Sequence, residues 1–110
     1  MVGHVADAER VFTYRALRFA RADATPLPGF DQDTWAKTTS AHSRMFVSLL
    51  DDLQALRAAT LSLFRGFDAA EWDRSGVASD NPVSVRALAF ITAGHERHHL
   101  SVVKERYLSK

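Results

Sequence analysis

The chain has 110 residues, of which 46% are hydrophobic and 25% charged, and its formal net charge is +1. This length suits one domain with a single core, the apolar content argues against disorder, and the small net charge gives no electrostatic signature of a nucleic-acid partner. The absence of cysteine excludes a disulfide scaffold and a thiolate metal site, so we expect one folded domain over residues 1–110.

The first predicted helix covers residues 5–22 approximately. Its apolar residues recur at steps of three and four, which is the spacing of one helix face: Val5, Ala8, Val11, Phe12, Ala16 and Phe19. Pro26 and Pro28-Gly29 prevent continuation of this helix, so residues 23–33 are expected to form a loop.

Four arginines gather in this first helix, at Arg10, Arg15, Arg18 and Arg21. Asp7 and Glu9 are interleaved with them, so we interpret the arginines as a solvated helix face. The alternative interpretation is a face that meets an anion.

A second helical region extends from about residue 33 to residue 66. The run Thr38-Thr39-Ser40 competes with helical hydrogen bonding, so we expect a break over residues 38–42. The second long helix then covers about 43–66 and ends at Gly66. We expect a short helical turn over 67–72 and a loop over 73–80.

The third long helix is predicted over about residues 82–107, because Asn81 is a good cap and Pro82 suits a first helical position. One continuous stripe on it carries Val85, Leu88, Ala89, Thr92, His95, His99, Val102 and Arg106. No segment has the pattern of a convincing strand. The sequence therefore predicts an all-α protein, an antiparallel bundle of three long helices.

Export and membrane signals are missing from the sequence. No basic and then apolar leader begins the chain, and no apolar run approaches the ~20 residues that span a bilayer. We expect a cytoplasmic protein with no membrane partner.

His95 and His99 are spaced i and i+4, which places both on one face of the third helix, about 6 Å apart along its axis. Both imidazoles can then reach one ion at Zn–N distances of about 2 Å. They share the apolar stripe with Leu88 and Val102, where an imidazole needs a hydrogen-bond partner or a metal. We predict half of a divalent-metal site; the alternative is a polar helix surface near a chain end.

His4 is the best candidate for a third ligand, since it opens the first helix on the side of Ala8, Val11 and Arg15. His98 points about 100° away from His99, so we interpret it as exposed or as a neighbour of the ligands. His42 lies in the expected helix break, where a surface position is the better interpretation.

The string from His95 to His99 also satisfies H-E-x-x-H, the zinc-peptidase signature in which the glutamate is the general base. Such peptidases take a third ligand well downstream and hold substrate against a sheet edge. Only eleven residues follow His99 and no sheet is expected, so a peptidase is the less favoured interpretation.

A broader resemblance covers nearly the whole chain. Residues 4–21 (HVADAERVFTYRALRFAR), the loop TPLPGFD at 25–31 and the segment SVRALAFITAGHERHHLSVVKERYL at 84–108 resemble the DinB-like family. The most specific features are Gly94-His95-x-x-His98-His99-Leu100 and a histidine that opens an Asp-x-Glu-Arg helix. The resemblance implies a four-helix bundle with a metal site of three histidines, here His4, His95 and His99.

The family's first helix and its connecting segment have no counterpart before His4. Either the chain is shortened or it is a natural short form. Because such a chain would expose the apolar strip that the absent helix covers, we expect self-association as a two-fold homodimer.

Three imidazoles leave a coordination position open, which is the pattern of a catalytic metal site. The metal is expected to be zinc or nickel, with iron and manganese as alternatives. The resemblance implies a metal-dependent S-transferase that uses a low-molecular-weight thiol, or a metal-dependent hydrolase. The alternatives are a non-catalytic metal-binding or stress-related helical oligomer, and a structural oligomer whose histidines are merely packed.

Three further residues are candidates for contact with substrate or ligand. Glu96 could act as a base or orient a ligand, although a solvated glutamate is the favoured interpretation. Arg97 and Tyr14 are candidate substrate contacts on the same footing.

Overall fold

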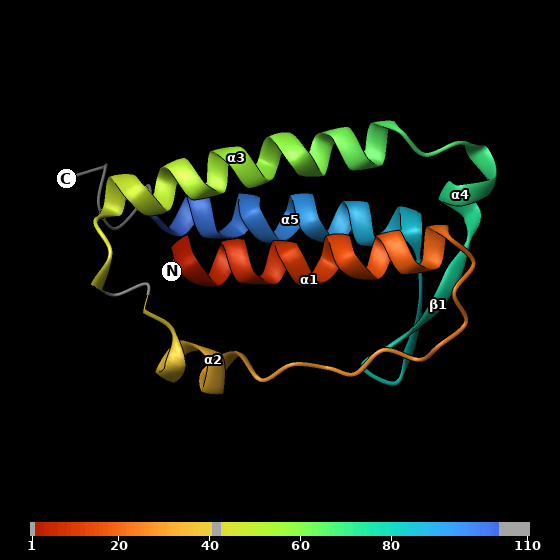
Figure 1. The fold of residues 1–110 in the computed structure, drawn as a ribbon, viewed down its shortest axis with the longest axis horizontal. Coiled ribbons are helices and arrows are strands. Elements are labelled where there is room, and N and C mark those ends of the chain that lie inside the picture. Colours follow the sequence, from red (N-terminus) through yellow and green to blue (C-terminus); the bar gives the residue numbers. More distant parts are fainter. Residues whose placement is uncertain (1, 41–42, 104–110) are drawn as a thin grey trace.

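Three long helices dominate the computed structural model and lie side by side along its long axis (Figure 1). They are α1 (Val2–Ala20), α3 (Phe46–Arg65) and α5 (Val85–Val103). They correspond to the three helices expected near residues 5–22, 43–66 and 82–107, although the third begins later than expected and residues 104–107 lie outside the described residues. The predicted all-helical bundle is therefore confirmed as the main architecture.

The structure describes the backbone of residues 2–40 and 43–103 and the side chains of residues 3–40 and 43–95. His42, which we expected at the surface, lies outside the described residues. In the part of the chain that is described, none of the helices has both the length and the apolar character that crossing a membrane requires.

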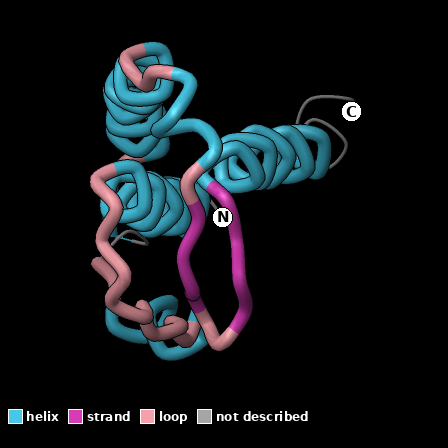
Figure 2. Tube along the Cα trace, turned by 90° about the vertical axis from the view of Figure 1, so that its right-hand side faces the viewer, coloured by secondary structure: helices cyan, strands magenta, loops and turns pink. Residues whose placement is uncertain are grey.

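α1 packs against both of the other long helices. α5 runs antiparallel to α1, whereas α3 runs in the same direction as α1 (Figure 1). Seen from the end, α3 and α5 lie on different sides of α1 (Figure 2). Contacts between the helices therefore converge on α1.

The main core lies where α1 ends and α5 begins, and it is built from all three long helices, the loop after α1 and a hairpin. Its buried members are Ala16, Phe19, Ala20, Leu27, Phe64, Phe67, Ala78, Val85 and Leu88. A smaller cluster of Val5, Ala6 and Leu53 joins the other end of α1 to α3. Most of the apolar stripe predicted for the first helix is thus buried, as its spacing requires.

Glu9 is a buried charge in the contact between α1 and α3, with only 2% of its surface exposed. Its carboxylate accepts a hydrogen bond from Arg57 Nη2 at 2.8 Å and another from Thr60 Oγ1 at 2.6 Å. A buried carboxylate is tolerated when it is paired and hydrogen-bonded. These two donors from α3 therefore fix the side of α1 that faces α3.

Backbone hydrogen bonds close α1 at its C-terminus. Ala22 has a left-handed φ of 61°, and the amides of Ala22 and Asp23 donate to the carbonyls of Phe19 and Arg18. This is the Schellman pattern, with alanine where glycine is usual. The loop that follows then turns back along α1.

Two short helices lie in the connections. α2 (Gln32–Thr38) begins at Asp31, whose side chain accepts from the amides of Asp33 and Thr34. The bond from the Thr34 amide holds the pKa of Asp31 below its usual value. α4 (Ala69–Asp73) begins with a capping box formed by Asp68 and Glu71. α2 lies at the start of the helical region predicted from about residue 33, and α4 lies where a short turn was predicted over 67–72.

A β-hairpin occupies the segment that we expected to be a loop and a helix start. β1 (Ser75–Ala78) pairs antiparallel with β2 (Asn81–Ser84), and the two residues between them have φ of 51° and 65°. Positive φ at both residues gives a type I′ turn, which suits the twist of a hairpin. The prediction of a strand-free chain with a loop over 73–80 was therefore wrong.

The start of the third helix was also wrong, because α5 begins at Val85 and not at Pro82. Ser84 Oγ accepts the amide of Ala87 at 2.9 Å and caps the helix in place of Asn81. Pro82 lies instead in β2, on a two-stranded sheet where its missing amide is tolerated.

We expect Glu9→Ala to lower the free energy of unfolding by about 3 kcal/mol, because it leaves Arg57 and Thr60 without their carboxylate partner. The matched control is Asp52→Ala. It removes partly exposed ion pairs to Arg10, between the same two helices, and to Arg44, and should cost less than about 1 kcal/mol. Urea unfolding followed by circular dichroism measures both values. Equal losses in the two variants would contradict the role given to Glu9.

Candidate metal centre

His4 and His95 lie next to each other although 91 positions separate them in the sequence. The antiparallel packing of α1 and α5 brings the first turn of α1 beside the middle of α5. The centroids of the two imidazole rings are 5.0 Å apart and the rings meet edge to face at 71°. Both residues are partly buried. The structure therefore brings two of the three predicted ligands together.

The ring separation can be compared with that of two imidazoles on one ion. With a metal–nitrogen distance of about 2.1 Å and tetrahedral angles, the two ring centroids would lie about 5 Å apart. Neutral imidazole is also a ligand that zinc, nickel and iron accept. The spacing and the chemistry of His4 and His95 therefore fit a shared divalent ion.

Phe12 lies on the other side of His95. Its ring centroid is 5.7 Å from the His95 ring and the two planes are nearly perpendicular. His95 thus lies between His4 and Phe12, two turns apart on α1, and Thr92, one turn before it, is buried. These contacts restrict the orientation of the His95 ring.

His99 follows His95 by one helical turn within α5, so its backbone continues the same face of that helix. Its side chain, and those of Glu96, Arg97 and His98, lie outside the described residues. Among the side chains that are described, no group of three His, Cys, Asp or Glu residues is close enough to hold a metal ion. The third ligand therefore stays a prediction.

Tyr14, the other residue expected to contact substrate, lies on a different side of α1. Its hydroxyl accepts a hydrogen bond from Arg18 Nη1 at 3.0 Å, and Arg18 also pairs with Asp23. These two partners raise the pKa of Arg18 above its usual value. Tyr14 therefore does not share the surroundings of His4 and His95.

Four arginines were expected on the solvated face of the first predicted helix, and one of them departs from that expectation. Arg15 is buried, and it lies on the same stripe of α1 as Ala8 and Phe19. That shared spacing was the sequence signal for burial, and the charge of the side chain hid it. Arg10, Arg18 and Arg21 each pair with a carboxylate near the surface, as a solvated face predicts.

Comparison of the chain with known proteins and protein families finds a match to a family model. The family model of the DinB superfamily matches residues 1–103. No curated protein and no solved structure gives a significant match. The matched range includes both α1 and α5 and therefore all three predicted ligands.

Proposed function

The chain belongs to the DinB superfamily, and from that premise we propose that it binds a divalent metal ion through His4, His95 and His99. The observation that supports this most directly is the 5.0 Å separation of the His4 and His95 rings. His99, one turn further along α5, supplies the third nitrogen. An i, i+4 pair on one helix and a single histidine from another is a compact way to hold one ion.

A set of three histidine ligands is typical of a metal site that can take part in a reaction. Three neutral imidazoles leave the charge of a divalent ion uncompensated and leave a coordination position for a small molecule. A bound ion of this kind supplies Lewis acidity, which lowers the pKa of a coordinated water or thiol. We propose zinc or nickel as the ion, with iron and manganese as the alternatives.

The finer proposal is a metal-dependent enzyme, either an S-transferase that uses a low-molecular-weight thiol or a hydrolase. In this proposal His4, His95 and His99 hold the ion, and Phe12 keeps the His95 ring in place. The alternative is a metal-binding protein without catalysis. The two differ in turnover and agree in metal content, so both quantities need to be measured.

We also propose that two copies associate through an apolar strip on α5. Phe90 is 74% exposed and Ile91 is 44% exposed. With Ala87 and Gly94 they follow the i, i+3, i+4, i+7 spacing of one helix face. A Cβ built at Gly94 meets nothing within 4 Å, so this face of α5 is open among the described residues. A second copy with the same strip would cover it about a two-fold axis.

We expect about one equivalent of metal per chain in the purified protein, measured by elemental analysis after exposure to zinc or nickel. His95→Ala should lose it, because two nitrogens hold a divalent ion far more weakly than three. A chelator should lower the melting temperature of the parent protein, since a ligand that binds only the folded state stabilises it.

His42→Ala is the matched control for the metal measurement, because it removes a histidine that is outside the predicted ligand set. It should keep the metal content of the parent. Equal metal content in His95→Ala and the parent protein, or none in either after metal is added, would overturn the proposed site.

For the enzymatic proposal, metal-loaded protein should accelerate the reaction of a small thiol with an electrophile, or the hydrolysis of an activated ester. The acceleration should fall at least about a hundredfold in His95→Ala, because loss of the ion removes the Lewis acid. Thiol consumption and ester cleavage are followed by absorbance. Stoichiometric metal with no turnover in either assay would favour the non-catalytic alternative.

For self-association, Phe90→Lys should shift the protein from dimer to monomer in light scattering, because it places a charge within the apolar strip. Val77→Lys is the control, since Val77 is an exposed apolar residue on the hairpin. It should leave the molecular mass unchanged. A parent protein that is monomeric at micromolar concentration would contradict the dimer.

A further inference from the structure

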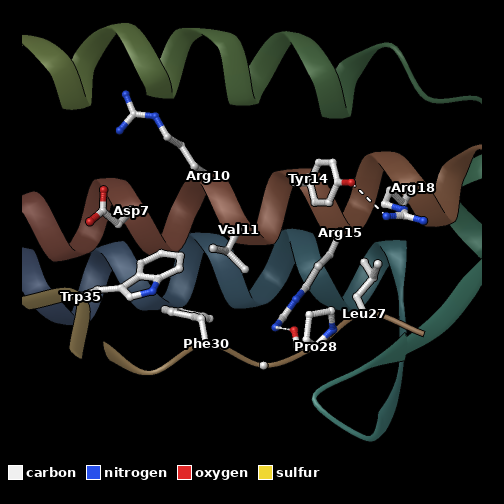
Figure 3. Close-up of a pocket in the computed structure, with 11 residues that line it drawn as sticks. Asp7, Arg10, Val11, Tyr14, Arg15, Arg18, Leu27, Pro28, Phe30 and Trp35 are labelled. Atoms are coloured by element: carbon white, nitrogen blue, oxygen red, sulfur yellow. Dashed lines mark hydrogen bonds between the residues drawn. The ribbon is translucent and has the colours of Figure 1, made fainter. Parts of the chain in front are cut away.

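A cavity of about 580 Å³ lies between α1 and the segment from Leu27 to Trp35 (Figure 3). Its volume is in the range of small-molecule sites, about 300–1,000 Å³. The walls are mainly apolar, with Val11 on α1 facing Phe30 and Trp35 across the opening. Neither His4 nor His95 lines this cavity, and the side chain of His99 lies outside the described residues.

The outer wall of the cavity is held by the hairpin. The amide of Leu27 donates to the carbonyl of Val77 at 2.8 Å, and the amide of Ser79 donates to the carbonyl of Leu27 at 3.0 Å. Leu27 is itself buried in the main core. The segment that begins at Leu27 is therefore fixed to the fold on one side, and the space between it and α1 is a built feature.

Arg15 places a buried cation in this cavity, with 8% of the residue exposed. Its Nη2 donates to the carbonyl of Pro28 at 3.0 Å and to Ser79 Oγ at 3.2 Å, and both acceptors are neutral. Burial lowers the pKa of Arg15, but a guanidinium stays charged near neutral pH. Within the described residues Arg15 forms no ion pair with a carboxylate.

Arg10 and Arg18 also line the cavity, but each of them pairs with a carboxylate. Arg10 Nη2 lies 3.0 Å from Asp52, and Arg18 Nη2 lies 2.7 Å from Asp23. In Figure 3 the side chain of Arg10 points toward α3, whereas Arg15 extends across the cavity toward Pro28. One carboxylate, Asp7, also lines the cavity, and it lies near Trp35 at the end away from Arg15 (Figure 3). The end of the cavity at Pro28 therefore carries the positive charge of Arg15. A buried cation gains most from an anion that can reach it.

The cavity wall that faces α1 is aromatic. The rings of Phe30 and Trp35 have centroids 4.7 Å apart and are tilted by 38°, and the Arg15 guanidinium lies 5.9 Å from the centroid of Phe30. Aromatic side chains of this kind offer faces and edges for a flat apolar group. The cavity thus combines an aromatic surface with one fork of N–H donors, and guanidinium matches the geometry of a carboxylate.

We propose that this cavity binds a small aromatic carboxylate, whose charged group pairs with Arg15 and whose ring packs against Phe30 and Trp35. The site is independent of the proposed metal centre. A ligand with the same ring and a neutral amide group lacks the ion pair and binds more weakly. An anion without the ring lacks the aromatic contact and also binds more weakly.

The test is calorimetric titration of the purified protein with 2-naphthoate, 2-naphthamide and acetate. We expect 2-naphthoate to bind at least about tenfold more tightly than either other probe, since a hydrogen bond to a charged group is worth roughly that factor or more. Arg15→Met should remove the preference for 2-naphthoate over 2-naphthamide. Trp35→Ala should weaken both naphthyl probes about fivefold.

If Arg15→Met does not fold, Trp35→Ala still tests the proposal. Trp35 is partly exposed and α2 has no buried residues, so Trp35→Ala should keep the fold. Arg21→Met is the matched control: it removes the same charge from the turn that directly follows α1. Arg21 does not line the cavity, so this variant should leave all affinities unchanged. The proposal is overturned by equal binding of naphthoate and naphthamide, or by unchanged naphthoate affinity in Trp35→Ala. His95→Ala should bind 2-naphthoate as the parent does; loss of binding there would assign the ligand to the histidines instead.

Discussion

The burial of α1 on three sides is the constraint on which the rest of the structure depends. α5 covers the side that carries His4 and Phe12, α3 covers the side of Glu9, and the segment after Leu27 covers the side of Val11. Each polar side chain on the buried sides of such a helix needs a hydrogen-bond or ion-pair partner. The polar residues of α1 are therefore informative about what surrounds it.

Two buried charges on α1 meet this constraint differently. The Glu9 carboxylate is satisfied within the fold by a cation and a hydroxyl from α3, so it acts as a fixed link between two helices. The Arg15 guanidinium is held by a carbonyl and a hydroxyl and borders a cavity. A closed ion pair stabilises one packing arrangement, whereas a cation at a cavity wall remains available to a ligand.

The helices were predictable because apolar residues repeat at the helical period over long stretches of the chain. The same spacing placed His95 on the buried stripe of α5, beside Leu88 and Thr92. The hairpin escaped prediction because its strands have four residues each, and Asn81-Pro82 has the composition of a helix start. Its position depends on pairing with Leu27, which lies some fifty residues earlier and leaves no periodic signal.

The sequence by itself determined the three long helices, the family and the histidine pair one turn apart on α5, because these follow from local spacing. Only the tertiary structure decided that the His4 ring lies beside the His95 ring, since that contact depends on the antiparallel packing of α1 and α5. It also decided that Arg15 borders a cavity, because the opposite wall comes from a loop that lies elsewhere in the sequence. Local periodicity tells which side of a helix is apolar, and packing alone decides what that side meets.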